Sequence, residues 1–250
     1  MFSEERKSEI VRIVNEKHSV TVQELTEQLG ASESTIRRDI TTLSREGKLV
    51  KVFGGAVALD ESPSNEELSV LAKESINRDE KVVIAKYAAS LIKPGDYVYL
   101  DSGTTTGYMI AYLTEKNATY VTNAVSHARD LVRAGFRVLL IGGELKENTE
   151  AVVGADAILH IQKYHFSKGF FGTNGVSVKL GFTTPDVREA LIKKVAILNT
   201  QAGARYILAD NEKFGMTSSV TFSELGGTVT ITDKQPPELY TKSMEIVVVE

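Results

Sequence analysis

The sequence of 250 residues contains no cysteine. Disulfide bonds, thiolate metal sites and a cysteine nucleophile are therefore excluded, and the composition is compatible with a reducing compartment. The first residues, 1–7, are charged and lack the apolar stretch of a signal peptide. The apolar runs, one of them interrupted by Lys86, are far shorter than the roughly 20 residues that span a membrane. We expect a soluble, cytoplasmic protein.

Sequence patterns for nucleotide and metal binding are absent as well. Neither G-x-x-x-x-G-K-S/T nor G-x-G-x-x-G occurs, which argues against a nucleotide ligand. The histidines lack the spacing to carboxylates that a metal site requires, and we expect them to be ordinary surface or packing residues. They are His18, His127, His160 and His165. We predict neither a metal nor a cofactor.

The charge of the chain is distributed unevenly. Its net charge of −4 argues weakly against nucleic-acid binding when the chain is treated as one body. Residues 37–51, however, contain five basic side chains and only two acidic ones, Asp39 and Glu46. A basic patch on an acidic protein suggests a DNA-binding module attached to a second domain. The basic residues are Arg37, Arg38, Arg45, Lys48 and Lys51.

Three short helices are predicted in the first 47 residues. The first begins at Ser3. The second begins with a capping box formed by Thr21 and Glu24, and it ends at Gly30, a residue type suited to a left-handed C-terminal cap. The third ends at Gly47. The stripes expected to be buried are Ile10, Ile13 and Val14, then Val22, Leu25 and Leu29, then Ile36, Ile40 and Leu43.

The second and third helices, joined by a tight turn, have the outline of a helix-turn-helix. The outer face of the third helix would then read DNA, because Arg can bind guanine and Ser or Thr hydroxyls suit phosphates or bases. Residues 49–53 and 56–58, separated by Gly54-Gly55, predict a hairpin that forms a wing. The predicted DNA contacts are Ser34, Thr35, Arg37, Arg38, Thr41, Arg45, Lys48 and Lys51.

A small helical bundle whose arginine pair is merely solvated is the alternative for this segment. The combination of capping box, tight turn and basic wing favours DNA binding. We therefore assign residues 1–58 to a winged helix-turn-helix domain. Residues 59–77 are acidic and lack clear periodicity, which predicts a linker, and residues 78–250 form the second domain.

The second domain alternates short apolar runs with helical stretches such as residues 82–92. Near-continuous apolar strands separated by helices predict an α/β fold with a mostly parallel sheet covered on both faces. Ligands of such sheets lie beyond the carboxyl ends of the strands. The predicted strands are residues 97–100, 119–121, 137–141, 169–171, 206–209, 229–231 and 246–249.

Polar loops follow several of these strands. Residues 102–106 resemble an anion cradle, since Gly103 admits a close approach, the hydroxyls donate and a helix follows. Residues 183–185 are expected to open another helix, with Pro185 in its first turn. A phosphate facing Lys193 and Lys213 would suit these loops, whereas capping alone explains any single loop. The predicted effector contacts are Asp101, Ser102, Gly103, Thr104, Thr105, Thr106, Asn123, Gly143, Gly172, Asn174, Thr184, Lys193, Asp210 and Lys213.

Several ordered motifs resemble those of the DeoR-type repressors of sugar metabolism, along essentially the whole chain. One departure is Asn211-Glu212, where the family more often has His-Ser. The resemblance implies a sensor domain similar in fold to ribose-5-phosphate isomerase, with sugar phosphates as inducers or co-repressors. The motifs are residues 5–7, 32–39, 51–57, 101–106, 122–123, 141–143, 172–176, 181–186 and 208–210.

Within that family, residues 116–123, 169–175 and 183–190 look most like repressors of fructose operons. This resemblance implies that operator DNA and fructose 1-phosphate are the partners. Because DNA readers of this class pair two half-sites, we also expect a homo-oligomer.

An aldose–ketose isomerase with an appended DNA-binding domain is the alternative function. Isomerisation needs a carboxylate base beside the carbon that loses its proton. The isomerases place acidic residues after the strand that matches residues 168–171, where this chain has residues 172–176 without a carboxylate. We therefore predict no catalytic residue and no enzyme. A DNA-binding protein without a ligand would leave the anion-cradle loops unexplained. The carboxylates that remain near strand ends are Asp101, Asp186, Glu189 and Asp210.

Overall fold

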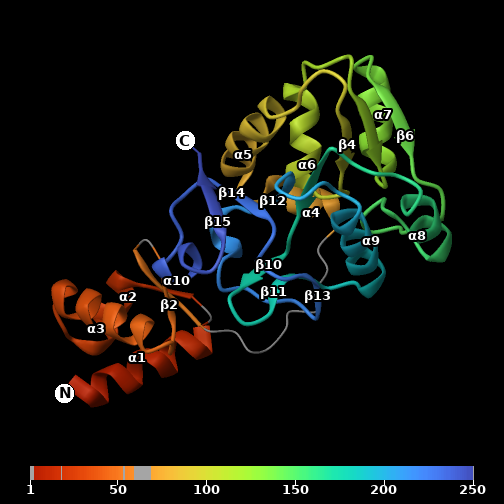
Figure 1. Cartoon of the computed structure of the whole chain (residues 1–250). Coiled ribbons are helices and arrows are strands. Elements are labelled where there is room, and N and C mark those ends of the chain that lie inside the picture. Colours follow the sequence, from red (N-terminus) through yellow and green to blue (C-terminus); the bar gives the residue numbers. More distant parts are fainter. Residues whose placement is uncertain (1–2, 18, 53, 59–68, 250) are drawn as a thin grey trace.

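The computed structural model describes residues 3–17, 19–52, 54–58 and 69–249. A small helical domain at the N-terminus adjoins a larger α/β domain, as the sequence predicts (Figure 1). In the small domain, α1 (Ser3–Lys17), α2 (Val22–Leu29) and α3 (Glu33–Arg45) surround one hydrophobic core. The capping box is confirmed, because Thr21 accepts from the backbone of Glu24 and the Glu24 side chain accepts from the backbone of Thr21. Gly30 ends α2 in the left-handed conformation.

The wing is a three-stranded antiparallel sheet in the order β1-β3-β2. Its strands are β1 (Ser19–Thr21), β2 (Val50–Val52) and β3 (Gly55–Val57). The predicted turn is displaced by one residue, because Gly55 pairs with Val52 inside the hairpin and is not a turn residue. The reason is β1, which the sequence did not reveal: a Cβ on Gly55 would lie 2.2 Å from the carbonyl oxygen of Val20.

The predicted linker contains a short helix. Its residues 59–68 lie outside the described part of the chain. The prediction of no periodic structure was wrong for α4 (Val70–Ser75), where Ser69 caps the helix by accepting from the backbone of Ala72 at 3.3 Å. Helix α5 (Arg78–Ser90) follows after Ile76 and Asn77.

The larger domain is built on a seven-stranded sheet. Each pair of adjacent strands that the structure describes in this sheet is parallel. All seven predicted apolar runs form its strands, which confirms the prediction. Their order is β15-β14-β12-β9-β4-β5-β6. The strands are β4 (Tyr97–Leu100), β5 (Thr119–Thr122), β6 (Arg137–Leu140), β9 (Lys168–Gly172), β12 (Arg205–Leu208), β14 (Val229–Thr232) and β15 (Glu245–Val248).

Helices cover both faces of this sheet (Figure 1). One hydrophobic core lies under α5, α6 (Thr104–Met109) and α7 (Val125–Arg133), where η1 (Ile110–Tyr112) extends α6. The other core lies under α8 (Ala155–Ile161), α9 (Val187–Leu198) and α10 (Glu238–Thr241). The loop between β6 and α8 carries a small ladder of β7 (Glu144–Leu145) and β8 (Val152–Val153).

A second antiparallel sheet supports the carboxyl edge of the large sheet. It contains β10 (Gly175–Ser177), β11 (Gly181–Thr184) and β13 (Val220–Ser223). The prediction that residues 183–185 open a helix was wrong, because Thr183 and Thr184 end β11. The cap of α9 is Asp186, which accepts from the backbone of Arg188 and Glu189. This carboxylate holds the two backbone N–H groups directly and therefore starts the helix after Pro185.

The wing packs against the larger domain. Val50 of β2 is 3% exposed and belongs to the hydrophobic cluster of that domain, together with Phe214. Phe214 follows η2 (Asn211–Lys213), the short helix after β12. Within the described ranges, no helix has both the length and the apolar character that crossing a membrane requires.

Candidate effector pocket and DNA-reading surface

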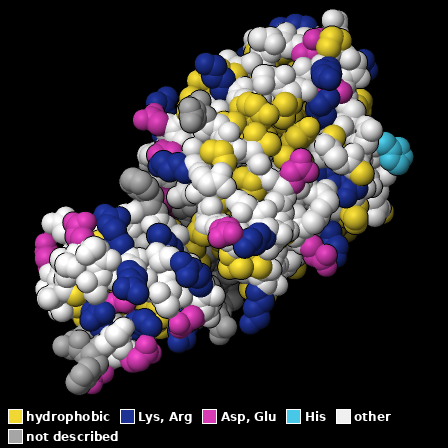
Figure 2. Space-filling view, turned by 60° about the vertical axis from the view of Figure 1, so that its left-hand side comes forward, with side chains coloured by type: hydrophobic (Ala, Val, Ile, Leu, Met, Phe, Trp, Pro, Cys, Tyr) yellow, Lys and Arg dark blue, Asp and Glu magenta, His cyan; other side chains and the backbone are white. Residues whose placement is uncertain are grey.

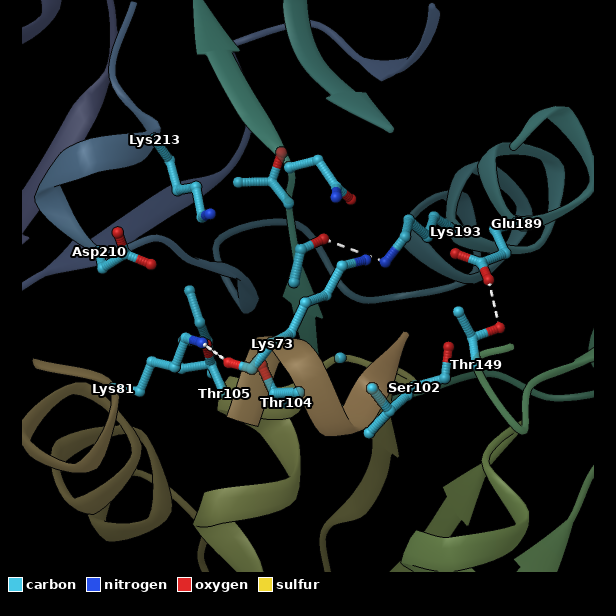
Figure 3. Close-up of a pocket in the computed structure, with 16 residues that line it drawn as sticks. Lys73, Lys81, Ser102, Thr104, Thr105, Thr149, Glu189, Lys193, Asp210 and Lys213 are labelled. Carbon is cyan, nitrogen blue, oxygen red and sulfur yellow. Dashed lines mark hydrogen bonds between the residues drawn. The ribbon is translucent and has the colours of Figure 1, made fainter. Parts of the chain in front are cut away.

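A cavity of about 70 Å³ lies beyond the carboxyl ends of β4, β9 and β12 (Figure 3). Residues 102–105 reach it after β4, residues 172–174 after β9, and Asp210 and Lys213 after β12. Helix α4 contributes Val70 and Lys73 to its lining. The predicted effector contacts that line the cavity are Ser102, Gly103, Thr104, Thr105, Gly172, Asn174, Lys193, Asp210 and Lys213.

The hydroxyl-bearing loop after β4 is held in place by Thr106. Its hydroxyl donates to the carbonyl oxygens of Asp101 and Gly103, both at 2.6 Å, and the side chain is fully buried. Thr106 therefore shapes the loop and does not line the cavity. Ser102 and Thr105, in contrast, line the cavity although both are largely buried.

Lysines surround the cavity, and two of them were missed by the sequence analysis. Lys81 of α5 is 4% exposed, and its Nζ donates to the carbonyl oxygen of Lys73 at 2.5 Å. Burial lowers the pKa of Lys81, and the nearby Lys213 and Lys73 lower this pKa further, while Asp210 opposes them. At this end of the cavity, Lys73, Lys81 and Lys213 lie near a single lining carboxylate, Asp210.

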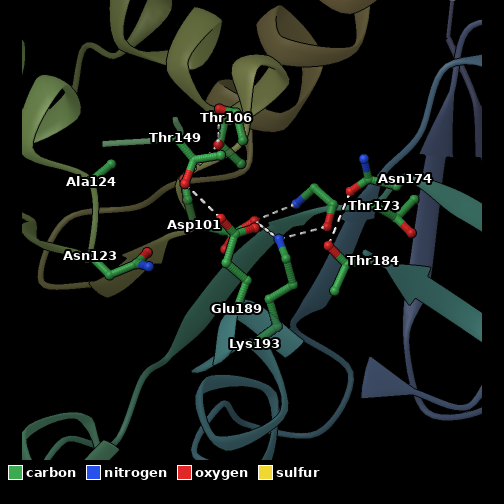
Figure 4. Close-up of polar contacts among 12 residues, drawn as sticks. Asp101, Thr106, Asn123, Ala124, Thr149, Thr173, Asn174, Thr184, Glu189 and Lys193 are labelled. Atoms are coloured by element: carbon green, nitrogen blue, oxygen red, sulfur yellow. Dashed lines mark hydrogen bonds and ion pairs between the residues drawn. The ribbon is translucent and has the colours of Figure 1, made fainter. Parts of the chain in front are cut away.

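Lys193 is already paired inside the protein. Its Nζ forms an ion pair with Oδ2 of Asp101 and donates to the carbonyl oxygen of Gly172 at 3.0 Å (Figure 4). Oδ2 of Asp101 also accepts from the backbone of Gly172 at 3.0 Å. Asp101 is 1% exposed and does not line the cavity, so its predicted contact with a sugar is incorrect for this structure.

Three further predicted contacts also point elsewhere. Asn123 is buried, accepts from the Tyr99 hydroxyl at 2.9 Å and donates to the carbonyl oxygen of Val152 at 3.2 Å. Thr184 donates to Oδ1 of Asn174 at 3.1 Å, and Gly143 packs against β8. Buried polar groups must find partners, and Asn123 and Thr184 find theirs within the protein. The predicted contacts outside the cavity are Asp101, Thr106, Asn123, Gly143 and Thr184.

One wall of the cavity is acidic. Glu189, in the first turn of α9, is 7% exposed and lines the cavity with Thr149. Its Oε1 accepts from the Thr149 hydroxyl at 2.6 Å and from Nζ of Lys146 at 3.1 Å. Burial alone would raise the pKa of Glu189, but Lys193, Thr149 and Lys146 outweigh it and lower the pKa. Glu189 is therefore a carboxylate at neutral pH.

The missed lysines differ in the signal that they leave in the sequence. Lys81 lies three, four and seven residues before Ile84, Ala85 and Ala88, so it occupies the buried face of α5. A lysine on an apolar helix face indicates a functional or paired charge, and this spacing was available from the sequence. Lys73 lies in a helix of six residues without a periodic apolar pattern, so no such signal existed.

The outer face of α3 carries the predicted DNA contacts. Lys and Arg side chains gather on the small domain in the lower left of Figure 2. Thr41 is half-buried: its hydroxyl donates to the carbonyl oxygen of Arg37 at 2.7 Å and accepts from Nζ of Lys51 at 2.9 Å. Lys48 pairs with Glu46 at 2.8 Å between α3 and the wing. The exposed contacts on α3 are Ser34, Arg37, Arg38 and Arg45, with Thr35 half-buried.

A buried ion pair fixes α3 against α1. Asp39, only 5% exposed, accepts from Nε of Arg6 at 2.6 Å. Asp39 directly follows the two arginines of the reading face, so this contact sets the rotation of α3 and presents Arg37 and Arg38 to the outside.

His127 and His160 fill structural positions, and His165 is exposed. His127 is buried beside Gly107, and burial lowers its pKa to about 4. His160 accepts from the backbone of Gly142 at 3.0 Å. His18 lies outside the described residues. Among the residues that the structure describes, no group of acidic or histidine side chains has the geometry of a metal site.

The two domains match two family descriptions. Residues 6–62 match the DeoR-like helix-turn-helix domain, and residues 76–234 match the DeoR C-terminal sensor domain. The chain belongs to the DeoR family of transcriptional regulators. Its members are sugar-operon regulators and not enzymes, so the isomerase alternative is set aside.

Known proteins similar to this DeoR-family chain share most of its length. A Bacillus subtilis (strain 168) protein named "Uncharacterized HTH-type transcriptional regulator FruR" is 43% identical over 93% of this chain and 91% of its own. A lactose phosphotransferase system repressor of Staphylococcus aureus (strain NCTC 8325 / PS 47) is 36% identical over 90% and 89%. Among solved structures, ribose 5-phosphate isomerase A from Methanocaldococcus jannaschii has a TM-score of 0.39 and 16% identity over 55% of each chain.

Proposed function

We propose that this DeoR-family regulator represses a sugar-utilisation operon. Fructose 1-phosphate binds in the cavity and lowers the affinity of the regulator for operator DNA. The observation that carries the proposal is the meeting of a hydroxyl-bearing loop, residues 102–105, with Lys73, Lys81 and Lys213 at the carboxyl edge of a parallel sheet. The resemblance of residues 116–123, 169–175 and 183–190 to repressors of fructose operons supports the fructose assignment.

The charge arrangement favours a phosphate at the lysine end. Lys213 is half-buried and forms no ion pair with any described residue, and Lys81 points its ammonium group to a carbonyl oxygen. A phosphate dianion would balance both charges and accept hydrogen bonds from Ser102 and Thr105. Lys193 contributes less than the sequence suggests, because Asp101 already neutralises it.

Binding requires the cavity to open. Its volume of about 70 Å³ is far below the roughly 300–1,000 Å³ of small-molecule sites. We expect helix α4 to be the part that moves, because it is a helix of only six residues. The backbone N–H of Val70 donates to the carbonyl oxygen of Asn148 at 3.2 Å. The carbonyl oxygens of Lys73 and Glu74 accept from the side chains of Lys81 and, at 2.9 Å, Tyr108. We expect the ligand to replace Lys73 in the cavity and to move α4.

DNA recognition would use α3 in the major groove and the wing on the backbone. Arg38 forms no ion pair with a described residue and remains available to a base, whereas Lys51 lies on the wing near the phosphates. Paired half-sites imply a homo-oligomer. Light scattering of the purified protein tests this part of the proposal, because a monomer at operator-binding concentrations would contradict it.

Calorimetry tests the effector assignment. Fructose 1-phosphate should bind, and fructose should bind poorly because it lacks the anion. A fluorescence-anisotropy titration with operator DNA, selected from a random library, should then show weaker DNA binding in the presence of fructose 1-phosphate. Equal affinity for fructose and its phosphate, or no binding of either, would refute the sensor assignment. Binding of a different sugar phosphate that Lys213→Ala weakens would correct only the ligand.

A further inference from the structure

We infer that Glu189 reads the hydroxyl groups at the end of the ligand remote from its phosphate, so that the pocket selects phosphate esters of neutral polyols and rejects phosphorylated carboxylic acids. This inference rests on the proposed function and specifies the chemical class of its ligand. Glu189 is not among the effector contacts predicted from the sequence.

The carboxylate is positioned with one oxygen free for a ligand. Oε1 of Glu189 takes both hydrogen bonds that the structure gives this side chain, from Thr149 at 2.6 Å and from Lys146 at 3.1 Å. Oε2 accepts from none of the described residues, and the side chain lines the cavity. Lys146 is itself fixed by Asp186 at 2.9 Å. A rigid carboxylate therefore presents one unused acceptor to the cavity.

The cavity has two chemically different ends. Figure 3 shows Lys81, Lys213 and Asp210 on one side and Glu189 with Thr149 on the opposite side. The lysine end brings two ammonium groups, of Lys81 and Lys213, beside one carboxylate, Asp210. At the other end Lys193 is occupied by Asp101, and Lys146 is shared between Asp186 and Glu189.

This polarity fixes the direction in which a ligand binds. A carboxylate only accepts hydrogen bonds, and an ionised phosphate oxygen is also an acceptor. The phosphate is therefore repelled from Glu189 and attracted by the lysines, while hydroxyl groups donate to Glu189. A ligand with a second anionic group at its far end would place that group against Glu189, and like charges in a desolvated site disfavour binding.

The decisive experiment compares Glu189→Gln with the wild-type full-length protein by calorimetry. The probes are fructose 1-phosphate, 6-phosphogluconate and inorganic phosphate. Glutamine keeps the shape and can still accept from Thr149, but it removes the charge. We expect wild-type protein to prefer fructose 1-phosphate over 6-phosphogluconate. In Glu189→Gln we expect about tenfold weaker binding of fructose 1-phosphate and no weaker binding of 6-phosphogluconate.

Two matched variants separate charge from local structure. Glu147→Gln removes an exposed carboxylate from the same loop as Thr149, outside the cavity, and should leave all affinities unchanged. Thr149→Val removes a hydrogen bond to Glu189 but keeps its charge, so it should retain the rejection of 6-phosphogluconate. Unchanged binding of inorganic phosphate by Glu189→Gln would show that the lysine end is intact.

The outcomes distinguish this inference from the function on which it rests. Selective binding of fructose 1-phosphate that Glu189→Gln leaves unaltered would overturn the role of Glu189 and spare the sensor assignment. Equal wild-type affinity for fructose 1-phosphate and 6-phosphogluconate would do the same. Wild-type protein that binds neither compound would overturn both.

Discussion

Replacing Lys193 with alanine tests whether this lysine supports the fold or contacts the ligand. The substitution leaves the Asp101 carboxylate, 1% exposed, with only the backbone N–H of Gly172 as a donor to Oδ2. Its Oδ1 already lacks a partner among the described residues. Breaking a buried ion pair by removing one partner costs about 3–5 kcal/mol. For a domain of this size that loss lowers the melting temperature by about 6–20 °C.

Thermal and urea unfolding of purified variants would measure this loss. Lys194→Ala removes an exposed lysine from the next position of α9 and should change the melting temperature little. A double variant, Asp101→Asn with Lys193→Met, removes both charges together and should recover much of the stability lost in Lys193→Ala. Lys193→Ala with unchanged melting temperature but lost ligand binding would refute the structural role and restore the direct contact expected from the sequence.

The remaining predictions concern the ligand, DNA, catalysis and the contact between domains. Lys213→Ala should weaken sugar-phosphate binding by about tenfold to a hundredfold in calorimetry without loss of stability, since a charge-assisted hydrogen bond contributes roughly 1.5–3 kcal/mol. Arg38→Ala should cost about 1–3 kcal/mol of specific operator binding in anisotropy at fixed salt, whereas Lys51→Ala should mainly flatten the salt dependence. The protein should not interconvert ribose and ribulose 5-phosphates; turnover above a heat-killed control, retained in Arg38→Ala and abolished by Glu189→Gln, would contradict this. Val50→Ala should reduce the effect of ligand on DNA affinity, and an unchanged effect would exclude the wing contact as its route.

The sequence predicted most of the architecture because repeating patterns encode it. Helical spacing of apolar residues located α2 and α3, and Thr21 and Gly30 marked the two ends of α2 through local backbone chemistry. The apolar runs of the second domain became the parallel strands, because a strand buried on both faces needs apolar side chains throughout. These signals lie within short stretches of sequence, so they do not depend on the tertiary fold.

The features that were missed depend on contacts between distant segments. Strand β1 has only three residues, and Gly55 acquires its role from the approach of Val20 more than thirty positions away. Asp101 and Asn123 were expected in the pocket because they follow strands. Their actual partners, Lys193 and Tyr99, come from other elements of the fold. The ends of the predicted strands therefore indicated where the cavity lies. The directions of the side chains depend on packing between elements, which these strand ends do not indicate.

One segment links the effector pocket to the reading helix. Lys213 lines the cavity, and two residues later Gly215 meets the wing, where its added Cβ would lie 3.3 Å from Val50. The next wing residue, Lys51, donates to Thr41 on α3 at 2.9 Å. A phosphate that draws Lys213 into the cavity would therefore act on the same segment that seats the wing. Contact between these residues couples ligand binding to DNA binding only if the wing contact has two arrangements that the ligand stabilises unequally. The quantity to measure in Val50→Ala is therefore the change in DNA affinity that the ligand causes.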